Sequence, residues 1–331
     1  MAGVKALLRP LAHGLDRRVA DVSLRLGGEG SGLLAFMFHS LFADRREAEA
    51  GLVDPFQPVT VADFRAFIDY FLSQGYRFVA PEDLLSGLDP AGRYAFITFD
   101  DGYANNLRAL PVLREFDVPA TFFISANHVI EGRGYWWDAL YRERLRQGRR
   151  ADEIEREQEA LKAMPHQAIE SRLREVFGAE VLRPEGEADR PMTEAELVDF
   201  GRDPRVTLGN HTVDHAILTV YDSDEGGAQI EACQRFLAGI TGAEPTIIAY
   251  PNGNHDARVV SVARERGLKL GAVTEPRRTP LPLSGEASMT IGRYAINGGP
   301  GLRGQCRSCQ SAVQLIHGTR RLRRRLRAAA A

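Results

Sequence analysis

The fold is decided by residues 94–125, which read YAFITFDDGYANNLRALPVLREFDVPATFFIS. Residues 94–99 and 120–125 are short apolar runs rich in aromatic and β-branched side chains, which is the composition of buried strands. Between them, the segment from about residue 104 to residue 116 is expected to be a helix. A strand, a helix and a second strand in succession form the unit from which parallel sheets are built.

The same alternation continues along most of the chain. Further strands are expected at residues 33–38, 76–80, 206–208, 246–250 and 268–273, and further helices after Thr60, after Thr193 and from about residues 224 and 257. This pattern predicts an α/β protein whose parallel sheet is either open or closed into a barrel. In such folds the chemistry collects at the carboxyl ends of the strands, so polar residues that directly follow a strand become the candidates.

The chain is predicted to have three parts. Residues 1–32 form an N-terminal helical extension, residues 33–300 the α/β domain, and residues 301–331 a basic helical tail. Within the α/β domain, the charged and mostly helical residues 137–200 indicate an insertion. Trp136 and Trp137 begin it, and we expect them to join the insertion to the rest of the domain rather than to stack on a ligand ring.

Composition excludes some function classes. The 331 residues are 44% hydrophobic, which is ample for a large core, and the net charge of −2 gives no field that would attract nucleic acid. The N-terminal apolar stretch is interrupted by charged side chains, unlike a secretory signal. No apolar run reaches the roughly 18–20 residues that span a bilayer. We therefore expect a cytoplasmic protein that binds no nucleic acid.

Two features near the C-terminus are weaker. Cys306 and Cys309 look like half of a structural zinc site, but such a site needs four ligands and the chain has only one other cysteine. Three cysteines also make no disulfide framework, which favours a reducing compartment. The run RRLRRRLR, residues 320–327, is interpreted as a solvated terminal helix, with weak contact to an anionic membrane surface as the alternative.

The first motif that carries chemistry is TFDDG, residues 98–102, directly after an expected strand. Asp100 and Asp101 are adjacent carboxylates, which repel each other unless a cation or a retained proton neutralises one of them. Gly102 lets the chain turn sharply. Because Asp-Asp-Gly is also a common surface turn, this motif alone leaves a structural and a functional interpretation open.

The second motif is HTVDH, residues 211–215, just after another expected strand. Histidines four residues apart lie on one face if the segment turns as a helix, as a metal chelate requires. A nearby aspartate supplies a third ligand, and two imidazoles with one carboxylate leave positions open for water and substrate. This combination favours a catalytic metal site over two polar residues at a helix start.

The third motif is AYPNG, residues 249–253, again at a strand end. Pro251 and Gly253 set the backbone geometry, and a free N–H after the proline could face a developing oxyanion. By itself this motif would be interpreted as an ordinary turn between a strand and a loop.

With all three motifs in order, the chain resembles the polysaccharide deacetylase family, the NodB-homology domain of carbohydrate esterase family 4. TFDDG matches the first motif of that family, His-Thr-x-x-His the second, and YPNG the Tyr-Pro variant of the third. The flanking sequence ALPVLREFDVPATFFI, residues 109–124, is also typical, and the resemblance runs from about Leu33 to Val273. It implies a distorted (β/α) barrel with fewer strands than a regular TIM barrel.

The resemblance also implies a divalent metal, with zinc expected first and cobalt or nickel as alternatives. Three residues would bind it: Asp101, His211 and His215. Asp100 would be the general base that takes a proton from the attacking water. The third motif would supply the contacts to substrate and oxyanion: Tyr250, Pro251 and Asn252.

Two positions depart from the family pattern. Many members carry an arginine in the third motif that orients the catalytic aspartate, where this chain has Ala249. Arg293, in the segment TIGRY, is the candidate replacement because a guanidinium pairs a carboxylate bidentately, although a surface strand residue is an equal alternative. For the general acid we favour His39, where some members with a permuted motif order carry a histidine, over His317.

The function that follows is hydrolysis, by metal-activated water, of an N-acetyl group on a sugar, polysaccharide or glycan precursor. The expected partner is therefore a carbohydrate substrate. Two alternatives stay open. One is a hydrolase of non-sugar linear or cyclic amides on the same fold, and the other is a non-catalytic carbohydrate-binding relative. The intact aspartate and histidine pairs argue against the second.

Overall fold

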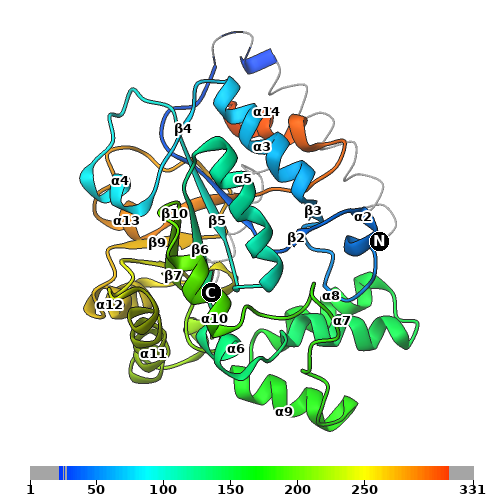
Figure 1. Ribbon diagram of the computed structural model, residues 1–331. Helices are drawn as coiled ribbons and strands as arrows, with labels where there is room; N and C mark the ends of the chain where they lie inside the picture. The colour runs from blue at the N-terminus through cyan, green and yellow to red at the C-terminus, as the bar shows by residue number, and fades with distance from the viewer. Residues whose placement is uncertain (1–21, 25, 27, 313–331) are drawn as a thin grey trace, which may run out of the picture.

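Parallel strands close into a ring at the centre of the computed structural model, which describes residues 22–24, 26 and 28–312 (Figure 1). Seven of the described strands form the ring: β1 Leu34–Phe38, β5 Tyr94–Phe99, β6 Ala120–Ile124, β7 Val206–Asn210, β8 Ile247–Ala249, β9 Leu270–Val273 and β10 Ile291–Ala295. The ring closes because β1 pairs in parallel with both β5 and β10. The predicted barrel with fewer strands than a TIM barrel is confirmed.

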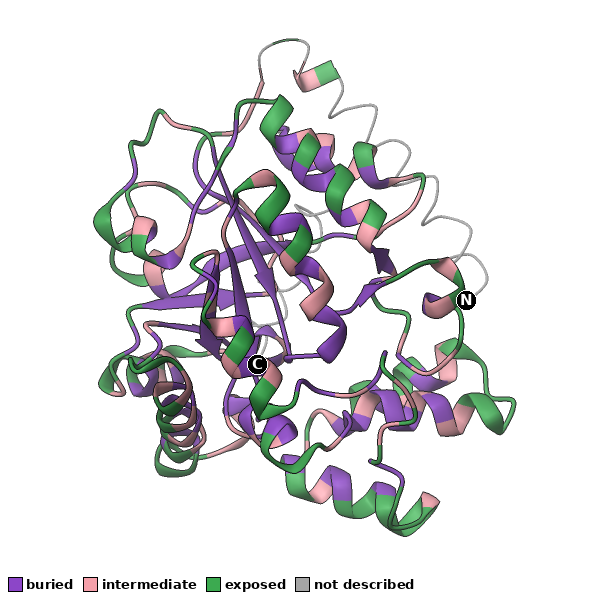
Figure 2. Cartoon of the chain, viewed as in Figure 1, coloured by how far each residue is buried: buried purple, intermediate pink, exposed green. Residues whose placement is uncertain are grey.

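Helices cover the outside of the ring, and Figure 2 shows buried strands surrounded by helices with exposed outer faces. The longer ones are α3 Val61–Ser73, α5 Ala109–Phe116, α10 Glu194–Gly201, α11 Ser223–Thr241, α12 Ala257–Glu265 and α14 Leu302–Gln310. The short ones are α2 Arg45–Ala48, α4 Pro81–Ser86, α6 Ala126–Glu131 and α13 Glu286–Met289. Thr60 and Thr193 begin α3 and α10 with the capping boxes that the sequence predicts.

Three short strands lie beside the ring. β4 Arg77–Phe78 pairs with β5, whereas β2 Leu41–Phe42 and β3 Val59–Thr60 pair only with each other. The helix expected over residues 104–116 begins as a 3-10 helix, η1 Ala104–Arg108, before it continues as α5. The last strand of the ring, β10, was not among the strands expected from the sequence.

Successive side chains of each strand point to opposite faces, so the core has one layer outside the ring of strands and one inside it. The rings of Phe36 and Phe38 point outward to α3, where Phe36 lies 4.8 Å from Phe67 and 4.7 Å from Phe71. A smaller cluster fills the inside: Ala35, Phe96, Phe123, Ile247, Ala249, Leu270, Ala272 and Ile291. Burial of each large apolar side chain contributes roughly 1.5–3 kcal/mol, so the two layers together hold the ring rigid.

The register places the ends of neighbouring strands side by side. Phe38 at the end of β1 pairs with Phe99 at the end of β5, and the Asp100 N–H donates to the Phe38 carbonyl at 2.9 Å. Asn210 at the end of β7 pairs with Ile124 of β6. The residues that follow β1, β5 and β7 are therefore delivered to the same edge of the barrel.

Three helices between β6 and α10 form a separate lobe, in the lower right of Figure 1. They are α7 Trp136–Arg146, α8 Ala151–Leu161 and α9 His166–Phe177. The lobe has a small core of its own that includes Trp136, Leu140, Leu161, Ile169 and Leu173. α10 instead packs on the barrel, because Leu197 and Phe200 belong to the main core.

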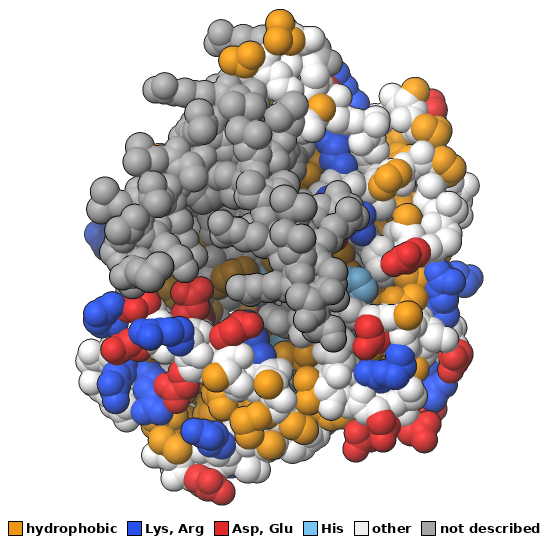
Figure 3. Space-filling view, turned by 180° about the vertical axis from the view of Figure 1, so that it is seen from behind, with side chains coloured by type: hydrophobic (Ala, Val, Ile, Leu, Met, Phe, Trp, Pro, Cys, Tyr) orange, Lys and Arg blue, Asp and Glu red, His pale blue; other side chains and the backbone are white. Residues whose placement is uncertain are grey.

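Some sequence predictions fall on the ends of the chain. Most of the expected N-terminal extension, the residue His317 and the arginine-rich run 320–327 lie outside the described residues. Among the described helices, none is both long and apolar enough to span a bilayer. On the uncovered surface in Figure 3, acidic and basic side chains lie interspersed, in keeping with a net charge of −2. The cytoplasmic location and the membrane contact stay predictions.

Candidate active site

Most of the candidate residues converge at one edge of the barrel. His39 follows β1, Asp100 and Asp101 follow β5, and His211 follows β7. Arg293 lies on β10, which pairs with β1. The sequence placed each of the first four after a strand, and the parallel register explains why they meet.

Asp101, His211 and His215 form a cluster of three metal-ligating side chains. One ligand atom from each lies within 4.8 Å of the others. The Nε2 atoms of His211 and His215 are each 3.4 Å from Oδ1 of Asp101. That oxygen is buried and has no hydrogen-bond partner among the described residues. Such an orphaned carboxylate oxygen is costly unless a cation or a donor satisfies it.

Both imidazole rings turn a nitrogen atom, Nε2, toward the Asp101 carboxylate. Nδ1 of His211 lies 2.8 Å from the Ala249 carbonyl, so this nitrogen carries the proton and donates it. In the neutral ring, Nε2 then presents a lone pair toward Asp101. Burial holds the pKa of His215 well below its usual value, which favours the neutral form of that ring. Two imidazole nitrogens and a carboxylate oxygen that face one another could serve as the donor set of a divalent metal.

The backbone of the second motif differs from the predicted helical turn. Residues 211–215 are irregular, and Thr212 and His215 adopt left-handed φ angles of 63° and 53°. This path still brings the two imidazole rings to 4.8 Å between centroids. Left-handed backbone costs a non-glycine residue roughly 1–3 kcal/mol and persists only where neighbouring contacts over-determine it. The expectation of a helical chelate was wrong, although the two rings do meet.

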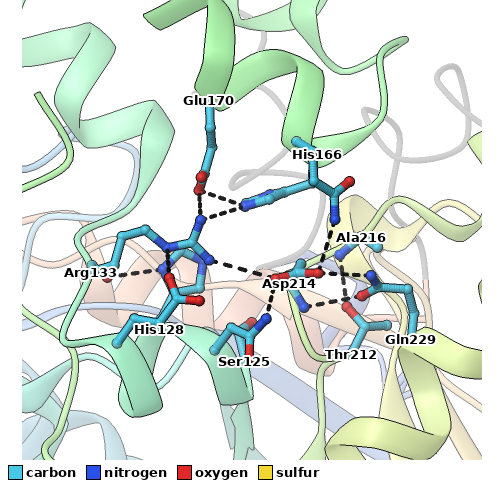
Figure 4. Close-up of polar contacts among 12 residues, drawn as sticks. Ser125, His128, Arg133, His166, Glu170, Thr212, Asp214, Ala216 and Gln229 are labelled. Atoms are coloured by element: carbon cyan, nitrogen blue, oxygen red, sulfur yellow. Dashed lines mark hydrogen bonds and ion pairs between the residues drawn. The ribbon is translucent and has the colours of Figure 1, made fainter. Parts of the chain in front are cut away.

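Hydrogen bonds to Thr212 and Asp214 provide those contacts. The Thr212 N–H donates to Asn210 Oδ1 at 2.8 Å, and the Ala216 N–H donates to Thr212 Oγ1 at 2.7 Å. The Asp214 carboxylate accepts from three amide side chains: Asn127 at 2.6 Å, Gln229 at 2.8 Å and Gln167 at 3.3 Å. These donors come from α6, α11 and α9, so three helices hold the loop that carries His215. Figure 4 shows Gln229 beside Asp214.

A buried ionic network continues from Asp214 into the helical lobe. Arg133 lies 3.6 Å from Asp214 and also pairs with Glu170 of α9. Glu170 lies 2.7 Å from Nε2 of His166, and Figure 4 shows the chain from Asp214 through Arg133 to Glu170. Burial alone would raise the pKa of Glu170, but His166 and Arg133 outweigh it and lower that pKa to about 2. The carboxylate is therefore ionised, and ion pairs connect the lobe with Asp214 of the second motif.

Arg293 holds Asp100 with two parallel hydrogen bonds. Its Nη1 and Nη2 atoms donate to the two carboxylate oxygens at 2.6 and 2.8 Å, and Nη1 also donates to Thr98 Oγ1 at 2.9 Å. Arg293 is fully buried, so it is not the surface strand residue that was the alternative. Burial raises the pKa of the Asp100 carboxyl, but the adjacent guanidinium outweighs burial and lowers that pKa below its usual range.

The remaining candidates divide between the site and the core. His39 hydrogen-bonds through Nδ1 to the side chain of Gln57. Asn252 has a left-handed φ of 57°, and its N–H has no acceptor among the described residues. Pro251 is buried beside it. The Tyr250 ring instead packs in the cluster between β8 and α12, stacked on His255, so its side chain points into the core.

Sequence reasoning missed three residues that support the site. Gln57 and Asp214 were not singled out, and no spacing signal marks either of them. Trp137 was expected only to join the lobe to the barrel. Its ring in fact lies 4.5 Å from that of His215, while its Nε1 donates to the Tyr103 hydroxyl at 2.9 Å. The tryptophan therefore does both: it joins the lobe and borders the cluster.

Comparisons with known proteins agree with the motifs. The sequence profile of the family described as polysaccharide deacetylase matches residues 88–160 and 185–271. The chain is 21% identical over 240 residues to YxkH of Bacillus subtilis (strain 168), whose name assigns it to the polysaccharide deacetylases. That match covers 71% of this chain and 62% of YxkH, so the chain spans less than two thirds of that relative.

Solved structures share the fold. A Streptococcus pyogenes deacetylase, PplD, in complex with acetate superposes with a TM-score of 0.58 at 16% identity, covering 86% of this chain and 99% of PplD. IcaB from Ammonifex degensii superposes with a TM-score of 0.57 at 18% identity, with the same two coverages, 86% and 99%. At these identities the likeness shows the architecture, and the profile match connects it with the motifs.

Proposed function

This chain belongs to the polysaccharide deacetylase family, and from that premise we propose that it is a metal-dependent hydrolase of an N-acetyl group on a sugar. The observation that carries the proposal is the cluster of Asp101, His211 and His215, whose buried carboxylate oxygen lacks a donor, directly beside Asp100. A cation held between the three ligand atoms would satisfy this oxygen, which has no hydrogen-bond partner among the described residues.

A divalent cation held by the cluster would lower the pKa of a water molecule and polarise the acyl carbonyl. Zinc suits two imidazoles and one carboxylate, with cobalt or nickel as alternatives. His211 is preset for this role because its Nδ1–H is already bound to the Ala249 carbonyl, which orients the ring and frees Nε2.

Asp100 is suited to act as the general base. Its carboxylate is ionised and fixed in one orientation by Arg293, yet each oxygen keeps a further lone pair that can accept a proton. The guanidinium remains charged throughout, so it orients the carboxylate without itself exchanging a proton. A base that is adjacent in sequence to a metal ligand can deprotonate water held at the cluster.

Two groups would act on the tetrahedral intermediate, one on its oxyanion and one on its leaving nitrogen. The Asn252 N–H, which has no acceptor among the described residues, would donate to the developing oxyanion. His39, one residue beyond β1, would protonate the nitrogen as the carbon–nitrogen bond breaks. His317, the other candidate for the acid, lies outside the described residues.

The proposed substrate is an N-acetylated sugar, whether free or within a glycan or its precursor. The names of YxkH and of the matched family support a polysaccharide, and the Trp137 ring beside His215 offers an apolar wall next to the cluster. An O-acyl sugar is the less favoured substrate.

Acetate release from N-acetylglucosamine, from nucleotide-linked N-acetyl sugars and from N-acetylglucosamine oligomers tests this proposal. The metal-loaded protein should release acetate from at least one of them, and removal of the metal with a chelator should abolish the activity. Ring opening of cyclic imides with no acetate release would show that the protein is an amide hydrolase of another class. Sugar affinity in a protein that purifies without metal would favour a binding relative.

A further inference from the structure

The side chain of Gln57 meets His39 at the mouth of the barrel. It comes from the loop between α2 and β3, and its Oε1 contacts Nδ1 of His39. The other ring nitrogen, Nε2, has no partner among the described residues. The ring also packs edge-on against Phe56, with centroids 5.4 Å apart.

The orientation of the Gln57 amide is determined by its other contacts. Its Nε2 donates to two backbone carbonyls, those of Met37 at 2.9 Å and Ile296 at 3.1 Å. Both donor hydrogens are therefore used, and the reverse orientation would place the amide oxygen against two carbonyl oxygens. Gln57 is buried, with 3% of its surface exposed, so water does not readily replace these bonds. The atom that faces His39 is a pure acceptor.

The loop that carries Gln57 is held by the helical lobe. The Asp54 N–H donates to Asp138 Oδ1 of α7 at 2.8 Å, and Gln158 of α8 donates to Asp54 Oδ2 at 2.7 Å. The Val59 N–H donates to the Gln57 carbonyl at 2.8 Å at the far end of the loop. Gln57 is thus held by its own side-chain hydrogen bonds and by the contacts of its loop with the helical lobe.

We propose that Gln57 is a positioning residue that fixes His39 in the tautomer with the proton on Nδ1. Nε2 then becomes the nitrogen that exchanges protons with the substrate. An amide oxygen accepts but never donates, so it favours a hydrogen on Nδ1 whether the ring is neutral or charged. A neutral partner also orients the ring without adding a second carboxylate near Asp100.

The consequence for the reaction rests on the proposed function, in which His39 is the general acid. As the carbon–nitrogen bond breaks, its electron pair stays on nitrogen, and the Nε2 proton of charged His39 passes to that nitrogen. His39 is left neutral with its proton on Nδ1, still bound to Gln57, and water restores the proton at Nε2. The ring need not rotate or change tautomer during the cycle.

Nitrogen-15 NMR of histidine-labelled protein tests the tautomer directly, at a pH at which the imidazoles are neutral. The His39 signals are assigned by their loss in the His39→Gln variant. We expect the wild-type signals to report a protonated Nδ1 and an unprotonated Nε2. We expect Gln57→Met to shift them toward the opposite tautomer, while the exposed control Gln74→Met leaves them unchanged. A wild-type ring with its proton on Nε2 would overturn the proposal without any variant.

A double-mutant cycle tests the catalytic consequence. Gln57→Met should lower kcat about 10-fold when His39 is present and have no further effect in a His39→Ala background. Metal content should not change, because His39 is not in the metal cluster. An equal loss of kcat in both backgrounds would show that Gln57 acts on the structure of the protein and not through His39. Full activity of His39→Ala would remove His39 as the acid, which is a failure of the proposed function that leaves the NMR result standing.

Discussion

At the scale of single residues, the pair of Asp100 and Arg293 joins two strands that are far apart in the sequence. The arginine expected in the third motif is replaced by Ala249, yet a guanidinium reaches the same carboxylate from β10. Ala249 is fully buried in the inner cluster, where its small side chain fits the packing of the barrel. The guanidinium that pairs with Asp100 therefore comes from β10 and not from the third motif.

Replacement of Arg293 by methionine should raise the pKa of Asp100, because burial then acts without an opposing charge. The base is active when ionised, so the rising limb of kcat/KM against pH should move to higher pH. Loss of one partner of a buried ion pair should also cost about 3–5 kcal/mol of stability.

Arg293→Lys is the matched control for this change. It keeps the charge and loses the planar fork, so its pH profile should lie between those of the wild type and Arg293→Met. A pH profile for Arg293→Met that coincides with the wild-type profile would contradict the role given to this arginine.

At the scale of elements, the helical lobe is more than an addition to the barrel. α7 and α8 hold the loop of Gln57 through Asp54, and α9 holds the second motif through Gln167 and the pair of Arg133 and Glu170. The strained loop of residues 211–215 depends on such contacts. We infer that the lobe is part of the support of the metal cluster.

Asp214→Asn should weaken metal binding about 10-fold, because it removes the charge that pairs with Arg133 and one of the acceptors that fix the loop. Competition with a chromophoric chelator measures this affinity. Asp199→Asn is the matched control, since Asp199 is an exposed aspartate of α10 that pairs with the exposed Arg202. Unchanged metal affinity in Asp214→Asn would show that the loop keeps its shape without the network.

At the scale of the whole molecule, the sequence predicts the architecture well where the pattern is local. Strands followed by polar motifs were found because a buried apolar run and the residue that follows it are contiguous, and the parallel register brings those residues to one edge. β10 was missed as a strand because an arginine interrupts its apolar run in the middle. That arginine is buried and pairs with Asp100, almost 200 positions earlier in the sequence.

Contacts between distant segments could not be predicted in the same way. Gln57 lies in a loop, and its role depends on carbonyls of residues 37 and 296. The turn of residues 211–215 was expected to be helical because the spacing of the histidines fits a helix. Hydrogen bonds from three separate helices instead stabilise left-handed residues there. A single sequence carries no local signal for such tertiary contacts.

The most direct test of the central claim is the pair of variants Asp101→Asn and Asp100→Asn, with metal content and kcat measured on the same samples. Asp101→Asn should lose metal and activity together, since its Oδ1 lies among the ligand atoms of the cluster. Asp100→Asn should retain the metal and lose at least about 100-fold in kcat, as removal of a general base does. Near-full activity of Asp100→Asn, or undiminished metal content in Asp101→Asn, would contradict the account.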